Sequence, residues 1–256
     1  MNKEINANGI GSDTIDVATP DVMPPKQTTS SSTNIQLSSS WFANRDLYEQ
    51  CTGPTVIVNN SNSELSFGGG GTNGAIRMFF FPEHDKCCCG MVKRGRQNQS
   101  LWIKLAGGLV LAPAQDLEEQ EESTEEQEES TTHEAVQSPG SVWYTPLPAE
   151  KRNGTHVTHI VHIVGPKNDY AFANGRTEDQ TREHAAAIVE DATLRCLHLA
   201  GELNASTIVM SGISSGIFAG GDKKWRAAMY NAMNSSFDKY KGTLNVVLVG
   251  QGWKKD

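Results

Sequence analysis

The chain has 256 residues, 37% of them hydrophobic, which is long enough for one domain with a sizeable core plus tails or insertions. Its formal net charge is −8, but residues 116–129 hold nine carboxylates and no Lys or Arg, so the rest of the chain carries +1. A near-neutral folded part gives no electrostatic reason to expect a nucleic-acid groove, which needs a clustered basic face. No apolar run approaches the ~20 residues that cross a bilayer, and the first residues form no apolar signal region. We therefore expect an intracellular chain, cytoplasmic or nuclear, without membrane contact.

Two segments are expected to lie outside the regular domain. Residues 1–40 are rich in Ser, Thr, Asn and Pro and cannot bury enough apolar surface to offset chain entropy, which predicts a disordered N-terminal tail. Residues 82–133 are expected to form an irregular insertion that includes the acidic low-complexity run 116–129. The insertion also holds three consecutive cysteines, but adjacent side chains diverge and the Cys-x2-Cys spacing of zinc sites is missing. No metal site is expected there. The domain, including this insertion, is expected to span residues 41–256.

The first glycine-rich segment follows a predicted buried strand. Residues 55–58 are apolar or β-branched, and the nine residues after them, most of them polar, lead to Gly68 to Gly71. A short helix is expected from Gly74 to Phe81, because Pro82 removes a helix donor and disfavours helix in the residue before it. Asn73 would then be the N-cap of that helix.

The middle of the chain offers two candidates for the next strand. Residues 101–111 and residues 142–147 both have strand-like composition, and the sequence leaves open which of them supplies the third strand. Residues 157–164 read as a strand that carries histidines. Because side chains alternate along a strand, His159 would point away from His156 and His162, which excludes a three-histidine metal site.

The last third of the chain alternates helices and strands. Thr177 and Gln180 form a capping box at the start of a helix that runs to Gly201. Residues 207–213 form a buried strand, a loop with two serines and four glycines follows, and Asp222 caps the next helix. A strand, a glycine loop and a helix start together suit phosphate, because successive backbone N–H groups can point at the anion. With a final strand at 244–249, the alternation predicts a three-layer α/β/α sandwich with helices on both faces of a mixed sheet.

Four of these segments, in this order, resemble the macrodomain family, whose members bind ADP-ribose. The similar segments are Val-Asn-Asn-Ser-Asn at 58–62, the glycine loop at 69–76, Ile-Val-His-Ile-Val-Gly-Pro at 160–166 and Ile-Ser-Ser-Gly-Ile-Phe-Ala at 213–219. The resemblance covers about residues 41–249 and is poor between 82 and 154. It implies the same three-layer fold, with the ligand in the crevice at the carboxyl ends of the strands.

The resemblance also implies roles for individual residues. It places the diphosphate between the two glycine loops, gives Asp46 the adenine amino group, and gives Asn62 the hydroxyls of the distal ribose. Asn62 and Asn73 take the catalytic positions, and Asn73 stands where some members carry an Asp, so it can hold a water but cannot take a proton. The ligand-binding set that follows from the resemblance is Asp46, Asn59, Gly69, Gly70, Gly71, Ser214, Ser215, Gly216, Ile217 and Phe218.

Three functions stay open at this point. The first is ADP-ribose binding with metal-independent removal of mono-ADP-ribose from modified protein side chains, by a glycohydrolase or esterase reaction. The second is a non-catalytic reader of ADP-ribose or mono-ADP-ribosylated protein. The third is a scaffold with a degenerate pocket, which binds a partner through its tail and acidic run. No cofactor is expected, and the chain is expected to be a monomer.

Overall fold

The computed structural model describes residues 33–63, 65, 70–82, 110–111, 137–168 and 175–250. These residues belong to the compact unit Ser31–Asp256. Four features of the sequence lie outside the described residues: the first 32 residues of the expected tail, Gly69, the three cysteines at 87–89 and the acidic run 116–129. Among the described residues, no helix combines the length and the apolar character needed to cross a membrane.

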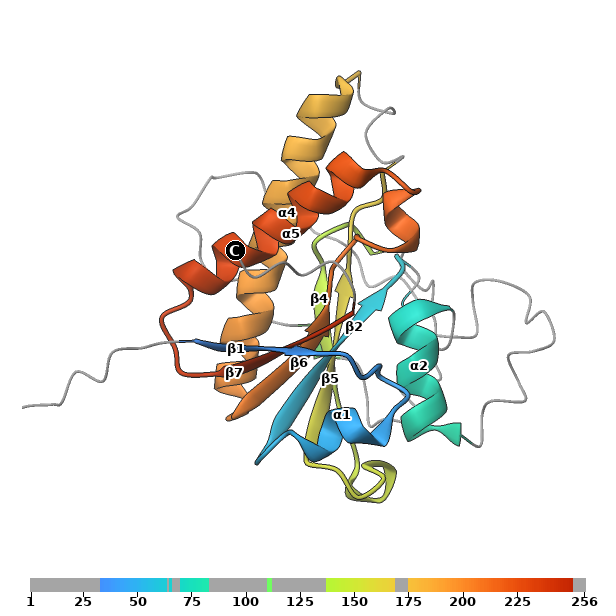
Figure 1. Cartoon of the computed structure of the whole chain (residues 1–256), viewed down its shortest axis with the longest axis vertical. Helices are drawn as coiled ribbons and strands as arrows, with labels where there is room; N and C mark the ends of the chain where they lie inside the picture. The colour runs from blue at the N-terminus through green and yellow to red at the C-terminus, as the bar shows by residue number, and fades with distance from the viewer. Residues whose placement is uncertain are drawn as a thin grey trace, which may run out of the picture. The chain divides into compact units, whose positions relative to one another are not determined.

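The centre of the fold is a mixed sheet with seven described strands (Figure 1). The order across the sheet is β1-β7-β6-β2-β5-β4-β3. The five strands from β1 to β5 in this order run parallel; β4 then pairs antiparallel with β5, and β3 pairs antiparallel with β4. Their bounds are β1 Asn34–Ser38, β2 Thr55–Ser61, β3 Val110–Leu111, β4 Val142–Pro146, β5 Val157–Val164, β6 Thr207–Ser211 and β7 Asn245–Val249.

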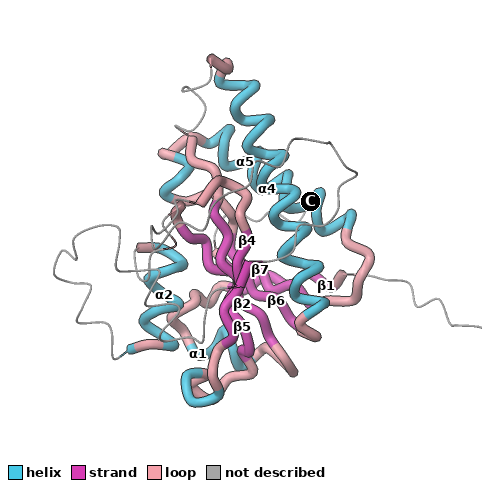
Figure 2. The backbone as a smooth tube through the Cα atoms, turned by 180° about the vertical axis from the view of Figure 1, so that it is seen from behind, coloured by secondary structure: helices cyan, strands magenta, loops and turns pink. Residues whose placement is uncertain are grey.

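Helices cover both faces of this sheet (Figure 2). One face packs against α4 (Glu178–Glu202) and α5 (Lys223–Lys239), and the other against α1 (Arg45–Glu49) and α2 (Gly71–Phe80). Alternate residues of one strand supply the two cores: Val56 and Val58 of β2 face α4 and α5, whereas Ile57 faces α1 and α2. Within the described residues, two 3-10 helices lie in connections: η2 (Ala149–Lys151) and η4 (Ile217–Ala219). The predicted three-layer α/β/α sandwich with a mixed sheet is confirmed.

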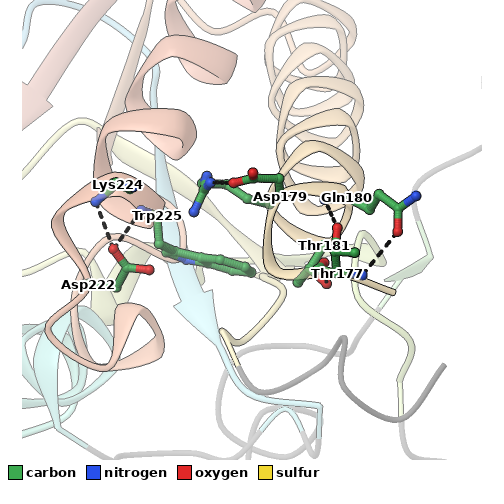
Figure 3. Close-up of polar contacts among 8 residues, drawn as sticks. Thr177, Asp179, Gln180, Thr181, Asp222, Lys224 and Trp225 are labelled. Atoms are coloured by element: carbon green, nitrogen blue, oxygen red, sulfur yellow. Dashed lines mark hydrogen bonds and ion pairs between the residues drawn. The ribbon is translucent and has the colours of Figure 1, made fainter. Parts of the chain in front are cut away.

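The start of α4 has the capping box that the sequence predicted (Figure 3). The Gln180 backbone N–H donates to the Thr177 hydroxyl at 3.3 Å, and the Thr177 backbone N–H donates to the Gln180 side chain at 3.0 Å. Two of the N–H groups that a helix start leaves without an intrahelical acceptor are thereby satisfied. This fixes where α4 begins, and its buried residues then pack against α5 and one face of the sheet.

Two boundaries differ from the sequence predictions, and one alternative that the sequence left open is resolved. Asn34–Ser38 lies within the expected tail, yet it forms β1 beside β7, because backbone hydrogen bonds to β7 stabilise a strand whose side chains are mostly exposed. Both candidate middle segments enter the sheet: β4 pairs with β5, and β3 extends the sheet beyond β4. Helix α2 begins at Gly71 with Gly70 as its N-cap, so Asn73 lies inside the first turn. The Thr72 hydroxyl bonds that of Ser211, and this contact holds the earlier turn against the sheet.

A buried histidine joins β2, β5 and β4. His162 is fully buried, with Asn59 Nδ2 at 3.0 Å from its Nδ1 and Thr145 Oγ1 at 2.9 Å from its Nε2. Because an amide nitrogen only donates, Nδ1 accepts, and the ring proton lies on Nε2, which donates to Thr145. Burial lowers the pKa of His162 from 6.5 to about 3, so the ring stays neutral in the folded protein.

This histidine should make the fold less stable in mild acid. Between pH 6.5 and about 3 the unfolded chain binds a proton at His162 that the folded chain does not, so the free energy of unfolding falls as pH falls through this window. The loss is at most about 1.4 kcal/mol per pH unit. Urea unfolding at pH 7, 6, 5 and 4.5 should show a shallower dependence for His162→Gln than for the unchanged chain, because Gln does not titrate. Parallel curves for the two proteins would contradict a buried neutral His162.

Candidate functional site

A cleft of about 390 Å³ opens where the parallel strands β1, β7, β6 and β2 end. This is the carboxyl edge of the parallel strands, where ligands bind in open α/β sheets. Both glycine loops reach the cleft, and so do the start of α5 and the turn after β1. Its lining residues are Trp41, Asn60, Gly70, Gly71, Thr72, Ser211, Gly212, Ser214, Ser215, Gly216, Ile217, Phe218, Arg226, Tyr230, Val249 and Gly250.

The loop after β6 turns its backbone N–H groups away from α5. The Ser214 carbonyl accepts from Trp225 Nε1 at 3.0 Å, the Ser215 carbonyl from Arg226 Nε at 3.0 Å, and the Gly216 carbonyl from the Ala219 N–H at 3.0 Å. In a trans peptide the C=O and the N–H point in opposite directions. The N–H groups that follow these carbonyls, those of Ser215, Gly216 and Ile217, therefore face away from the groups that hold the loop.

These N–H groups belong to a longer run of free donors. Within the described part of the chain, five consecutive backbone N–H groups donate to no partner, those of Ser214, Ser215, Gly216, Ile217 and Phe218. All five residues line the cleft. A concave run of unpaired N–H groups is a binding site for an anion, because each contributes a partial positive charge in a fixed direction.

The first turn of α5 holds this loop in place (Figure 3). Asp222 is the N-cap, and its carboxylate accepts from the N–H groups of Lys224 at 2.8 Å and Trp225 at 3.2 Å. The hydrogen bond from the Trp225 N–H, with that from Lys224 and the charge of Arg182 beside it, holds the pKa of Asp222 below its usual value. Gly220 and Gly221 precede the cap with φ of +57° and +85°, values that glycine adopts without strain. The cap thus places the side chains of Trp225 and Arg226 beside the loop.

Arg226 gives the cleft its charge. Of the described residues that line it, Arg226 alone carries a charged side chain, and none is a carboxylate. Its Nε is engaged by the Ser215 carbonyl, so the side chain is anchored next to the free N–H groups. A guanidinium has five N–H donors, of which this bond uses one. Guanidinium and free backbone N–H groups together favour an anionic ligand.

A polar cluster forms the floor of the cleft between β2 and β6. Asn60 Nδ2 donates to Ser211 Oγ and to the Gly212 carbonyl, both at 3.1 Å. The hydroxyls of Thr72 and Ser211 lie 2.9 Å apart. Asn60 Oδ1 is buried and accepts from no described group. The amide of Asn60 and the hydroxyls of Ser211 and Thr72 give the cleft floor both donors and acceptors.

The two glycine loops face each other across the cleft. A Cβ on Gly70 would lie 3.8 Å from Ile217 Cδ1, which belongs to the opposite loop. The Ile217 side chain is 82% exposed, unusually open for a large apolar residue. Phe218, the next residue, has its ring under Lys167, with the ammonium 5.3 Å from the ring centroid. A ligand between the loops would cover the exposed Ile217 side chain.

The structure brings seven of the predicted site residues together and leaves four others outside the cleft lining. Those that line it are Gly70, Gly71, Ser214, Ser215, Gly216, Ile217 and Phe218. Asp46 is exposed on α1, Asn59 is buried against His162, Asn62 is half-buried after β2, and Asn73 is buried in the first turn of α2. None of these four is among the lining residues, and Gly69 lies outside the described residues.

Sequence reasoning missed lining residues that come from other elements. Asn60 could have been found by strand alternation, because it lies on the same side of β2 as Val58 and next to the predicted loop. Arg226 lies four residues after the helix cap Asp222, in the first turn of a helix that starts at the ligand edge. Trp41 had no local signal, because only the pairing of β1 with β7 brings it to the cleft. Across the described residues there is no group of three His, Cys, Asp or Glu side chains that could hold a metal ion.

Comparison with known proteins gives structural likeness only. No model of a known protein family matches the sequence, and no curated protein does. Among solved structures, a glycine-to-valine mutant of the Oceanobacillus iheyensis macrodomain with ADPR is similar at 18% identity and a TM-score of 0.50, covering 86% of this chain and 87% of that one.

Two further structures are similar at lower scores. The Trypanosoma brucei macrodomain in complex with ADP-ribose has 14% identity and a TM-score of 0.46, over 84% of this chain and 62% of that one. The alphavirus P23pro-zbd has 14% identity and a TM-score of 0.47 over 87% of this chain, which spans 22% of the viral one. The likeness to the Oceanobacillus domain, together with the observed order of strands and helices, shows that this chain has the macrodomain fold.

Proposed function

We propose that the cleft binds ADP-ribose, either free or attached to a protein. The observation that carries the proposal is the run of five unpaired backbone N–H groups beside Arg226. A diphosphate has several anionic oxygens, so it can accept hydrogen bonds from a row of N–H donors and a guanidinium at the same time. A ligand with a single carboxylate would leave most of these donors without an acceptor. The Oceanobacillus domain of the same fold was solved with ADPR, which supports this choice among diphosphate ligands.

The rest of the cleft suits the parts of ADP-ribose on either side of the diphosphate. The floor cluster of Asn60, Ser211 and Thr72 offers both donors and acceptors, as a ribose with free hydroxyls requires. Phe218 gives an aromatic surface against which the apolar face of that sugar can pack. Arg226 and the N–H groups then lie between this polar end and the end at Trp41.

Isothermal titration of ADP-ribose into the full chain tests the proposal. We expect one site per chain with micromolar affinity, roughly −7 to −8 kcal/mol, as is typical of a preformed crevice. ATP should bind much more weakly, because it has no distal ribose to reach the floor cluster. Equal affinities for ADP-ribose and ATP would mean that the floor cluster does not contact the distal ribose. The proposal would be contradicted if neither ligand gave a measurable heat of binding.

Removal of mono-ADP-ribose from modified side chains is a second candidate, favoured by the polar cluster of Asn60, Ser211 and Thr72 on the cleft floor. Such a cluster could hold a water against the sugar, and positioning alone can contribute much of a rate. No described carboxylate lines the cleft to take a proton, which favours binding without turnover as the primary function.

A release assay separates the two candidates. The unchanged chain and Asn73→Asp are incubated with a protein that is mono-ADP-ribosylated on carboxylates, and free ADP-ribose is measured. Asn73 is the position at which the sequence resemblance sets the Asp of some macrodomains, and it lies in the first turn of α2, next to the cleft-lining Thr72. Release by the unchanged chain would make hydrolysis the primary function. Binding without release by either protein would leave a reader.

A further inference from the structure

The cleft has a fixed order along the edge of the sheet. Its lining passes from Trp41, Val249 and Gly250 after β1 and β7, through the loop after β6, to Asn60 of β2. Neighbouring strands lie about 4.8 Å apart, so the four strand ends span about 14 Å. With the diphosphate at the central loop and the distal ribose at Asn60, as in the proposed function, the other end receives the base.

An exposed indole dominates that base end. Trp41 is 40% exposed, although its neighbour Phe42 is completely buried. The two rings meet edge to face, with centroids 5.5 Å apart at 83°. A Cβ on Gly250 would lie 3.6 Å from the indole, so the chain after β7 runs close to the ring. The indole is therefore supported on two sides while part of it stays open to a ligand, and an indole of this kind is a stacking platform for a flat ring.

Apart from the indole N–H, the described side chains at the base end offer no polar group with which to distinguish one base from another. The other described lining residues there are Val249 and Gly250, which have no polar side-chain atoms. Asp46, the residue expected to accept from the adenine amino group, is on α1 and does not line the cleft. Telling an amino group from a carbonyl oxygen requires a directed acceptor or donor, whereas stacking tolerates any base because every base has a π-face.

We propose that Trp41 binds the base by stacking and that the site accepts purine nucleoside diphosphoriboses as a class, with adenine and hypoxanthine bound alike. The inference rests on the proposed function, because it assumes that the protein recognises the diphosphate and the distal ribose specifically. Hypoxanthine differs from adenine by an oxo group in place of the amino group. The pair therefore isolates amino-group recognition from ring size and stacking.

The test compares ADP-ribose with inosine 5′-diphosphoribose by calorimetry on the full chain. The two dissociation constants should agree within about threefold. Trp41→Ala should weaken both ligands by roughly tenfold, the loss expected when one stacking partner is removed, and Trp41→Phe should retain most of the affinity. Met78→Ala is the matched control, because Met78 is 46% exposed on α2 and does not line the cleft.

Each outcome bears on one claim. Binding of inosine 5′-diphosphoribose more than tenfold weaker than ADP-ribose to the unchanged chain would overturn the inference and leave the proposed function standing. Equal, unchanged affinities in a folded Trp41→Ala would also overturn it, because the indole would then not be the platform. Binding of neither ligand to the unchanged chain would defeat the proposed function and, with it, the inference.

Discussion

Gly216→Glu is expected to abolish ADP-ribose binding, with at least a 100-fold loss of affinity and an intact fold. A Cβ on Gly216 would meet no protein atom within 4 Å, so the new side chain has room without displacing its neighbours. Gly216 lines the cleft within the run of free N–H groups, so the side chain would occupy the space of the diphosphate. Its carboxylate would also repel the phosphates at short range. Calorimetry measures the affinity, and thermal unfolding shows whether the fold is unchanged.

Two variants separate the causes of this loss. Gly216→Lys fills the same space with a side chain of the opposite charge. The difference in ADP-ribose affinity between Gly216→Lys and Gly216→Glu therefore measures the electrostatic share of the loss. Asn234→Glu adds the same negative charge on an exposed position of α5 that does not line the cleft, and it should bind ADP-ribose normally. Affinity of Gly216→Glu within threefold of the unchanged chain would show that the diphosphate does not lie at this loop.

Trp225→Ala should destabilise the fold by about 3–5 kcal/mol. The side chain is 1% exposed in the core between the sheet and α4 and α5, so its removal leaves a large cavity. It also leaves the Ser214 carbonyl without its donor. For a chain of this size the expected fall in the melting temperature is on the order of 10 °C. Thermal and urea unfolding measure the change.

Comparison with other tryptophan variants shows whether burial is the cause. Trp225→Phe keeps an aromatic ring but loses the N–H, so it should cost about 1–3 kcal/mol and loosen the loop. Trp41→Ala removes the same side chain from a position that is 40% exposed and should cost less than about 1 kcal/mol. Equal losses for Trp225→Ala and Trp41→Ala would contradict the structural role given to Trp225.

Local patterns were enough to predict the elements whose own residues stabilise them. The apolar run in β2 and β6 and the capping box of α4 are signals within a few neighbouring residues, and all three elements lie where they were expected. Strand β1 was missed because its own side chains carry little signal: four of its five residues are exposed. Its stability comes from hydrogen bonds to β7, about 200 residues away, which no local pattern can show.

The same reasoning explains which part of the cleft could be foreseen. The glycine loop after β6 was recognisable because serine and glycine composition and the cap Asp222 are contiguous in sequence. Its carbonyls accept hydrogen bonds from the side chains of Trp225 and Arg226. That could not be foreseen, because both residues belong to the following helix and no local pattern connects their side chains with the loop. Trp41 reaches the cleft only because of the order of the strands in the sheet. Thr72 reaches it because α2 starts three residues before the predicted position.

Amide proton and nitrogen chemical shifts in ¹⁵N-labelled protein test most directly whether the loop after β6 binds the diphosphate. On titration with ADP-ribose, the amides of Ser215, Gly216 and Ile217 should shift downfield with one saturating curve, because each gains a charged acceptor. Amides at the opposite edge of the sheet, such as that of Asn153 shortly before the start of β5, should not move. Saturable binding of ADP-ribose that leaves these three loop amides unshifted would contradict the account.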